Sequence, residues 1–192
     1  MSSLLERENY HLDHGTKVAR RDFGYSAETD CPADGGKSPI PLNFKKEGFR
    51  GLEYFPIDPN YQFKLKLHHY NVPAKAPIVL SNGGQVEALR VGFLEFEIEG
   101  RKRRLQVYKK KTEDKEVFVP FKDGTSGKET YEAGRYVDVE LDSSDNSCVL
   151  DFNLSYSPLC MFDQTKFVCP IPPAENSLLD LRIQAGEKKL KL

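Results

Sequence analysis

The sequence lacks long hydrophobic runs and any excess of charge of one sign. No stretch approaches the roughly 18 consecutive apolar residues of a membrane-spanning helix, and the first residues have no apolar centre of the kind that signal peptides carry. Lys and Arg number 28 against 29 Asp and Glu, so no overall field favours nucleic acid or an anionic membrane. We therefore expect a soluble, cytoplasmic protein with neither nucleic acid nor membrane as a partner.

Cysteine is also scarce. The four cysteines are too few for a disulfide scaffold, and none lies in a C-x-x-C pair. Cys160 and Cys169 allow three interpretations: two small buried thiols, a loop-closing disulfide, or two thiolate ligands of a metal. Buried thiols are favoured, because a reducing cytoplasm opposes a disulfide and a metal would need further ligands. We therefore expect neither a metal site nor a cofactor.

The residues that are present suit an ordinary globular protein. Apolar residues make up 39% and charged residues 30% of the chain, and 192 residues suit one domain. Residues 3–23 carry mixed charge with loosely spaced leucines, which predicts a short amphipathic helix. Residues 24–59 are rich in glycine and proline, which predicts an irregular wrapping arm. The expected organisation of 1–192 is thus a helix and arm over 1–59, followed by a β core over 60–192.

From residue 60 onward the hydrophobic pattern has a period of two. Apolar and polar residues alternate over 61–70, as in a strand with one buried face. Further short strands are predicted at 77–81, 85–99, 105–108, 116–121, 135–141, 147–153 and 178–184. About seven or eight short strands without helices between them are typical of an antiparallel sheet. The predicted fold class is therefore mainly β, an antiparallel β-barrel that is closed or nearly closed.

The alternation slips by one residue inside the longest predicted strand. Leu89 and Val91 share one parity, whereas Leu94 and Phe96 share the other. An added residue turns all following side chains to the opposite face of a sheet. This slip predicts a β-bulge near residues 92–94.

The loop over residues 123–136 contains the densest cluster of special residues. Its glycines, hydroxyl side chains and Arg135 form a possible cradle for an anion or a carbonyl group. A phosphate-binding P-loop is excluded, because Gly127-Lys128 lacks the required earlier glycine and is followed by Glu129. The alternative is that polar side chains of this loop cap a tight turn. In either case we expect Arg135 to be ordered, partly buried and paired with Asp123 or Asp151.

Four strings in the sequence carry a family resemblance: VPFKDGTSGKETYEAGRYVD (119–138), LDFNLSYSPLC (150–160), CPIPPAEN (169–176) and AGEK (185–188). With weaker matches before residue 60, the chain resembles a bacterial and archaeal family, the domain of unknown function sixteen eighty-four. The resemblance implies a compact domain and a shared, mostly polar constellation. Its members are Asp123, Thr125, Ser126, Glu129, Thr130, Tyr131, Arg135, Tyr136, Asp151, Asn153, Tyr156, Glu175 and Asn176.

Three functions are compatible with this constellation. The first is a module that binds a small polar or anionic ligand at the open end of the barrel, with the three tyrosines lining the pocket. The second is a hydrolase or lyase in which Glu129, Asp138, Asp151 or Glu175 is the general acid or base and Arg135 the electrophilic clamp. The third is an interaction protein whose polar residues form a buried hydrogen-bond network. The binding module is the favoured prediction, and the sequence leaves open whether the protein is an enzyme.

Overall fold

The computed structural model describes residues 25–26, 51–111 and 114–190. Strands dominate this part of the chain, and its helices are 3-10 turns of three residues each, which confirms the mainly β fold class. The helix expected over residues 3–23 and most of the arm expected over 24–59 lie outside the described residues. No helix in these ranges is both long enough and apolar enough to cross a membrane.

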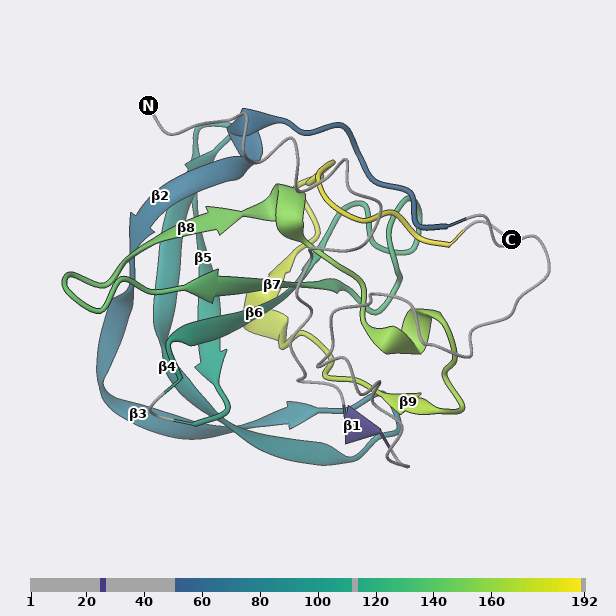
Figure 1. Cartoon of the computed structure of the whole chain (residues 1–192), viewed down its shortest axis with the longest axis horizontal. Helices are drawn as coiled ribbons and strands as arrows, with labels where there is room; N and C mark the ends of the chain where they lie inside the picture. Colours follow the sequence, from purple (N-terminus) through teal and green to yellow (C-terminus); the bar gives the residue numbers. More distant parts are fainter. Residues whose placement is uncertain (1–24, 27–50, 112–113, 191–192) are drawn as a thin grey trace.

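The strands form one large sheet and two small ones (Figure 1). In the large sheet the order is β10 (Ser177–Leu178), β6 (Glu116–Asp123), β5 (Arg101–Lys109), β4 (Gln85–Ile98) and β3 (His68–Val79), and β7 (Arg135–Glu140) also pairs with β6. The small sheets pair β2 (Gln62–Lys66) with β8 (Ser147–Asp151), and β1 (Tyr25–Ser26) with β9 (Phe167–Val168). All these pairings are antiparallel except that of β10 with β6.

The large sheet is an open half-barrel, so the prediction of a closed or nearly closed barrel was wrong. A barrel closes only when every strand has a hydrogen-bonded neighbour on both sides. Here β2 and β8 form a separate ladder, and the described link between β8 and the end of β7 is the isolated bridge Leu141–Cys148. The wall is therefore interrupted, a feature that alternation within single strands does not encode.

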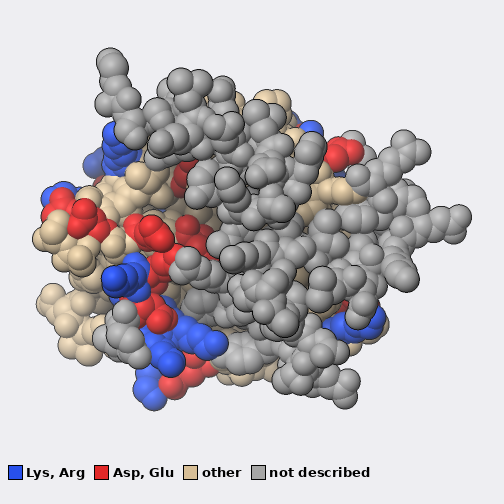
Figure 2. Space-filling view, viewed as in Figure 1, with Lys and Arg blue, Asp and Glu red and all other residues tan. Residues whose placement is uncertain are grey.

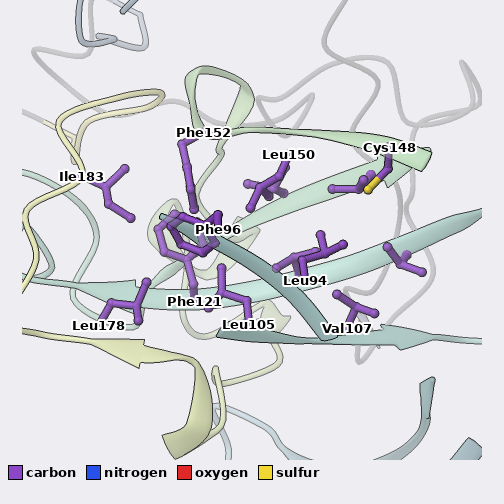
Figure 3. Close-up of a cluster of buried hydrophobic side chains, with 14 of the residues drawn as sticks. Leu94, Phe96, Leu105, Val107, Phe121, Cys148, Leu150, Phe152, Leu178 and Ile183 are labelled. Carbon is purple, nitrogen blue, oxygen red and sulfur yellow. The ribbon is translucent and has the colours of Figure 1, made fainter. Parts of the chain in front are cut away.

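The inner side of the half-barrel is filled by apolar side chains from the large sheet, from β8 and from residues 179–190, which we call the C-terminal segment (Figure 3). Phe152 lies at its centre, with ring centroids 5.1 Å from Phe121 and 5.5 Å from Phe96. Burying each such ring stabilises the fold by roughly 1.5–3 kcal/mol. A second apolar cluster lies apart from this core and consists of Ile78, Ala88, Tyr108, Phe118, Tyr136 and Tyr156. We call the side of the sheet that carries this cluster the outer side.

The predicted bulge is present in β4. Arg90 pairs with Tyr108 and Gly92 with Val107, so Val91 is the extra residue, immediately before the predicted range. Beyond it, Leu94 is fully buried in the main core, as the parity slip predicted. Glycine is required at position 92, because a Cβ atom there would lie 2.2 Å from the carbonyl oxygen of His68. A second register irregularity lies beside it in β3, between His69 and Ala74.

The strand predicted over residues 178–184 is largely absent. Only Ser177–Leu178 forms a strand, and it runs parallel to β6. Further on, the backbone amide of Ile183 donates to the Asp123 carboxylate at 2.7 Å, and the Ile183 carbonyl accepts from Arg135 at 2.9 Å. At Ile183 side chains thus take the place of a neighbouring strand, whereas the Leu181 carbonyl accepts from the backbone amide of Gly124 at 2.6 Å.

Candidate functional site

Arg135 begins β7 and is fully buried. Its guanidinium donates to the Asp123 carboxylate at 3.4 Å, to the Ser155 hydroxyl at 3.1 Å, and to the carbonyl oxygens of Ile183 and Ala185. These contacts confirm that Arg135 is ordered and paired with Asp123, and they show deeper burial than the sequence predicted. The two carbonyl contacts fix the C-terminal segment against the half-barrel.

Asp123 organises the loop that follows β6. Its carboxylate accepts hydrogen bonds from the hydroxyl of Thr125 at 2.9 Å and from that of Ser126 at 3.4 Å. The Thr125 hydroxyl is in turn 2.9 Å from that of Thr130. Asp123, Thr125 and Thr130 are all nearly or fully buried. The turn-capping interpretation therefore describes this loop well, and the same carboxylate also holds the C-terminal segment.

Glu187 is a buried charged residue that the candidate constellation missed. It is fully buried, and its negative charge acts on Arg135 together with that of Asp123. Burial lowers the pKa of Arg135, whereas the two carboxylates oppose this effect. Glu187 lies in the last of the strings that carry the family resemblance, which was the available signal.

Of the two carboxylates expected as partners of Arg135, Asp151 caps a turn instead. Its carboxylate accepts from the backbone amide of Asn153 at 3.0 Å and from the side chain of Gln62 at 2.7 Å, rather than from Arg135. It thereby caps the 3-10 turn Phe152–Leu154. Asn153 in turn hydrogen-bonds both the amide and the carbonyl of Asp58. These two residues fasten the segment before β2 to the end of β8.

Two of the three candidate tyrosines pack together, and the third belongs to another apolar cluster. Tyr136 and Tyr156 meet edge to face on the outer side, with ring centroids 5.6 Å apart. Their hydroxyls donate to the Pro170 carbonyl at 2.5 Å and to the Asp138 carboxylate at 2.7 Å, respectively. Tyr131 packs in a separate cluster and accepts from Gln164 at 3.2 Å. Each ring is at most 6% exposed, and each hydroxyl has a partner within the chain.

Cys160 and Cys169 form a disulfide, so the favoured interpretation as two free thiols was wrong. The chain between them folds back on itself through the 3-10 turn Leu159–Met161 and β9. Ser81 anchors this loop, because it exchanges hydrogen bonds with Cys169 at 2.9 and 3.1 Å. Sequence spacing alone does not reveal such an approach. Free thiols were favoured because a cytoplasmic location was expected, and that location stays a prediction.

The four carboxylates of the enzyme hypothesis lie in separate surroundings. Glu129 is paired with Arg182 at 2.6 Å, which lowers the pKa of this glutamate. Asp138 binds the Tyr156 hydroxyl, Asp151 caps its turn, and Glu175 faces Arg90. Among the described contacts no two of these carboxylates share a partner. Each of the four is thus engaged by its own described neighbours, and the enzyme hypothesis stays a prediction.

A different set of residues meets on the outer side, where the irregularities of β3 and β4 lie next to each other. Bulges re-aim side chains and are frequent beside functional sites. Here the Arg90 guanidinium lies over the Tyr70 ring, 5.7 Å from its centroid, and Nη1 is 3.8 Å from the Glu175 carboxylate. Tyr108 is directly opposite Arg90 in β5. We call Tyr70, Arg90, Tyr108 and Glu175 the Arg90 site.

The surroundings of the Arg90 site are well fixed. The Tyr70 hydroxyl donates to the Gln106 side chain at 2.7 Å. Asn176, which is fully buried, bonds both backbone groups of Gln106 and thereby holds the turn that carries Glu175 against β5. Burial, with a smaller contribution from Glu175, raises the pKa of Tyr108 to about 12, so its hydroxyl stays protonated at neutral pH. Of these residues, the sequence identified only Glu175 and Asn176 as candidates.

The basic run over residues 101–111 is paired to a large extent. Arg103 binds Asp180 at 2.7 Å, and Arg104 binds Glu95 at the same distance. In Figure 2 the described part of the visible face shows basic and acidic side chains intermixed. The expectation that nucleic acid is not a partner stays a prediction.

The fold and these contacts define a class: a β-rich half-barrel whose C-terminal segment is held by a buried arginine. Residues 47–188 match the family described as "Protein of unknown function (DUF1684)", and the chain belongs to that family. It is similar to the solution structure of an uncharacterized protein from gene locus rrnAC0354 of Haloarcula marismortui, with 36% identity and a TM-score of 0.63. The match covers 79% of this chain and 83% of that one. None of the curated proteins compared matches the chain.

Proposed function

We propose that the protein is a binding module for a small polar ligand and that an anionic group of this ligand contacts Arg90. The observation that supports this proposal is that the Arg90 guanidinium is partly exposed and has no hydrogen-bond acceptor within hydrogen-bond distance among the described contacts. Its Nε is buried without a hydrogen-bond partner, and the carboxylate nearest to it stands 3.8 Å from Nη1. A bound carboxylate or phosphate would accept hydrogen bonds from the terminal nitrogens of this partly exposed side chain, because the Glu175 carboxylate lies beyond hydrogen-bond distance of Nη1.

Other arginines of the chain show why Arg90 stands out. Arg104 also lies over an aromatic ring, that of Phe93, but its Nε donates to Glu95 at 2.7 Å. Arg103 and Arg135 share the buried, unpartnered Nε, yet their terminal nitrogens hold Asp180 and the C-terminal segment. The Arg90 side chain is 35% exposed and lacks such a hold. It therefore combines accessibility with spare hydrogen-bonding capacity.

Titration with inorganic phosphate and with a panel of small carboxylates that includes amino acids, followed by NMR chemical shifts and calorimetry, tests this proposal. We expect at least one probe to bind and to shift the resonances of β4 and β5. Arg90→Gln should abolish binding and Arg90→Lys should weaken it strongly, because an ammonium lacks the planar fork. Arg104→Gln is the matched control and should bind like the wild type. Absence of binding by every probe, or equal binding by Arg90→Gln, would overturn the proposal.

A further inference from the structure

We propose that the ligand of the Arg90 site is a zwitterion of the amino-acid type, with its carboxylate on Arg90 and its ammonium group on Glu175. This inference rests on the proposed function and adds the chemical class of the ligand. It derives from the two opposite charges that the site presents side by side.

The pair formed by Arg90 and Glu175 is open rather than closed. Its N–O distance of 3.8 Å exceeds the 2.7–3.2 Å of an N–H···O hydrogen bond. Both side chains are partly exposed, at 35% for Arg90 and 56% for Glu175. By contrast, Arg104 and Glu95 close to 2.7 Å on the same sheet. The open pair keeps a donor and an acceptor available to a ligand.

The signs of these charges select among ligands. A simple anion on Arg90 would meet the like charge of Glu175, and a simple cation on Glu175 would meet that of Arg90. Only a ligand that carries both charges interacts favourably with both residues, because like-charge juxtaposition opposes binding. Tyr108 adds a protonated hydroxyl and no further charge. Electrostatic complementarity therefore favours a zwitterion over either singly charged class.

The geometry also limits the spacing of the ligand's charges. Since Arg90 and Glu175 are neighbours, the ligand's carboxylate and ammonium must be neighbours too. An α-amino acid meets this condition, because both groups are bonded to one carbon. A long chain with an amine at one end and a carboxylate at the other does not. The Tyr70 ring, already under Arg90, offers an apolar surface beside the charges.

The experiment compares three probes that differ in one group: L-leucine, 4-methylpentanoate, which lacks the amine, and 3-methylbutylamine, which lacks the carboxylate. The same comparison uses L-phenylalanine with 3-phenylpropanoate and 2-phenylethylamine. Calorimetry or NMR titration gives the affinities. We expect at least one amino acid to bind ten-fold or more tightly than both of its counterparts.

Two variants assign the effect to Glu175. Glu175→Gln should remove the ten-fold preference, since it weakens the amino acid and strengthens the carboxylate that lacks an amine. Glu95→Gln, which changes the closed pair instead, is the matched control and should keep the preference. Both variants keep Asn176, which holds the turn against β5, and we therefore expect both to fold.

The outcomes separate the two proposals. If carboxylates bind as tightly as their amino acids, or if Glu175→Gln keeps the preference, the zwitterion inference is wrong while the anion-binding function stands. If amino acids, carboxylates and phosphate all fail to bind, the proposed function fails together with this inference.

Discussion

Arg135 and Arg90 each lie over an aromatic ring of the same sheet and each have a buried Nε without a partner, yet the contacts of their other nitrogens differ. Arg135 is fully buried and donates to a carboxylate, a hydroxyl and two carbonyl groups. Arg90 is partly exposed and faces a single carboxylate at 3.8 Å. An arginine whose donors are used by its own chain stabilises the fold, whereas one with unused donors at the surface keeps hydrogen-bonding capacity, and on this we base the proposal for Arg90.

The residues implied by the family resemblance also differ in whether their side chains are buried and bonded within the chain or are exposed. Asp123, Thr125, Thr130 and Asn176 are buried, and their side chains hydrogen-bond within the chain. Glu175 alone among the thirteen faces Arg90 on the outer side. A polar string in a sequence can therefore mark a hydrogen-bond network that fixes loops as readily as it marks a ligand site.

The largest expected effect comes from Arg135→Lys. An ammonium cannot reach the carboxylate, the hydroxyl and both carbonyls together, so Asp123 loses much of its compensation and the C-terminal segment loses its anchor. Breaking a buried ion pair costs about 3–5 kcal/mol, and we expect the free energy of unfolding in urea to fall by about 3 kcal/mol. Arg104→Lys, at an exposed pair, should change it by less than about 1 kcal/mol. Equal effects of the two substitutions would end the distinction between the interior and the surface arginine.

A smaller loss is expected from Cys160→Ser combined with Cys169→Ser. The disulfide closes a loop whose next residue, Pro170, accepts the Tyr136 hydroxyl on the outer side. Removing a short-loop disulfide lowers stability by about 2 kcal/mol, and denaturation with and without reductant should show the same loss in the unmodified protein. A non-reduced digest analysed by mass spectrometry should contain the two cysteine peptides linked. Two unlinked thiol peptides would instead support the interpretation of Cys160 and Cys169 as two buried thiols.

A smaller effect is expected on the pH dependence of stability, and it comes from Tyr108 on the outer side of the sheet. Its pKa is raised from 10.0 to about 12, first by burial and then by Glu175. Between these values the unfolded chain has lost the proton that the folded protein keeps, so the stability contributed below pH 10 is lost as the pH rises toward 12. Phenolate absorbance and thermal unfolding should show this decline. Tyr108→Phe should make it shallower, and an unchanged slope in that variant would contradict the assignment.

Glu175→Gln extends the same measurement to the Arg90 site. Because Glu175 raises the pKa of Tyr108, the substitution should lower that pKa and move the onset of phenolate absorbance to lower pH. Glu95→Gln provides the control, since Glu95 acts on Arg104 rather than on Tyr108. A shift in both variants, or in neither, would contradict the proximity of Glu175 to Tyr108.

Local periodicity and residue chemistry were sufficient to predict several features of this protein. Alternation located most strands, and its slip located the bulge within one residue, because a buried face repeats every second position. The cost of burying an unpaired guanidinium was enough to predict that Arg135 has a carboxylate partner.

The remaining features could not be predicted, because each depends on which distant segments of the chain meet. The half-barrel stays open since β2 and β8 form their own ladder, and residues after β10 leave the sheet since Asp123 and Arg135 bind their backbone. The disulfide depends on how the loop between its cysteines folds back. The Arg90 site joins β3, β4, β5 and a turn 85 positions beyond Arg90, and no period along the chain connects them.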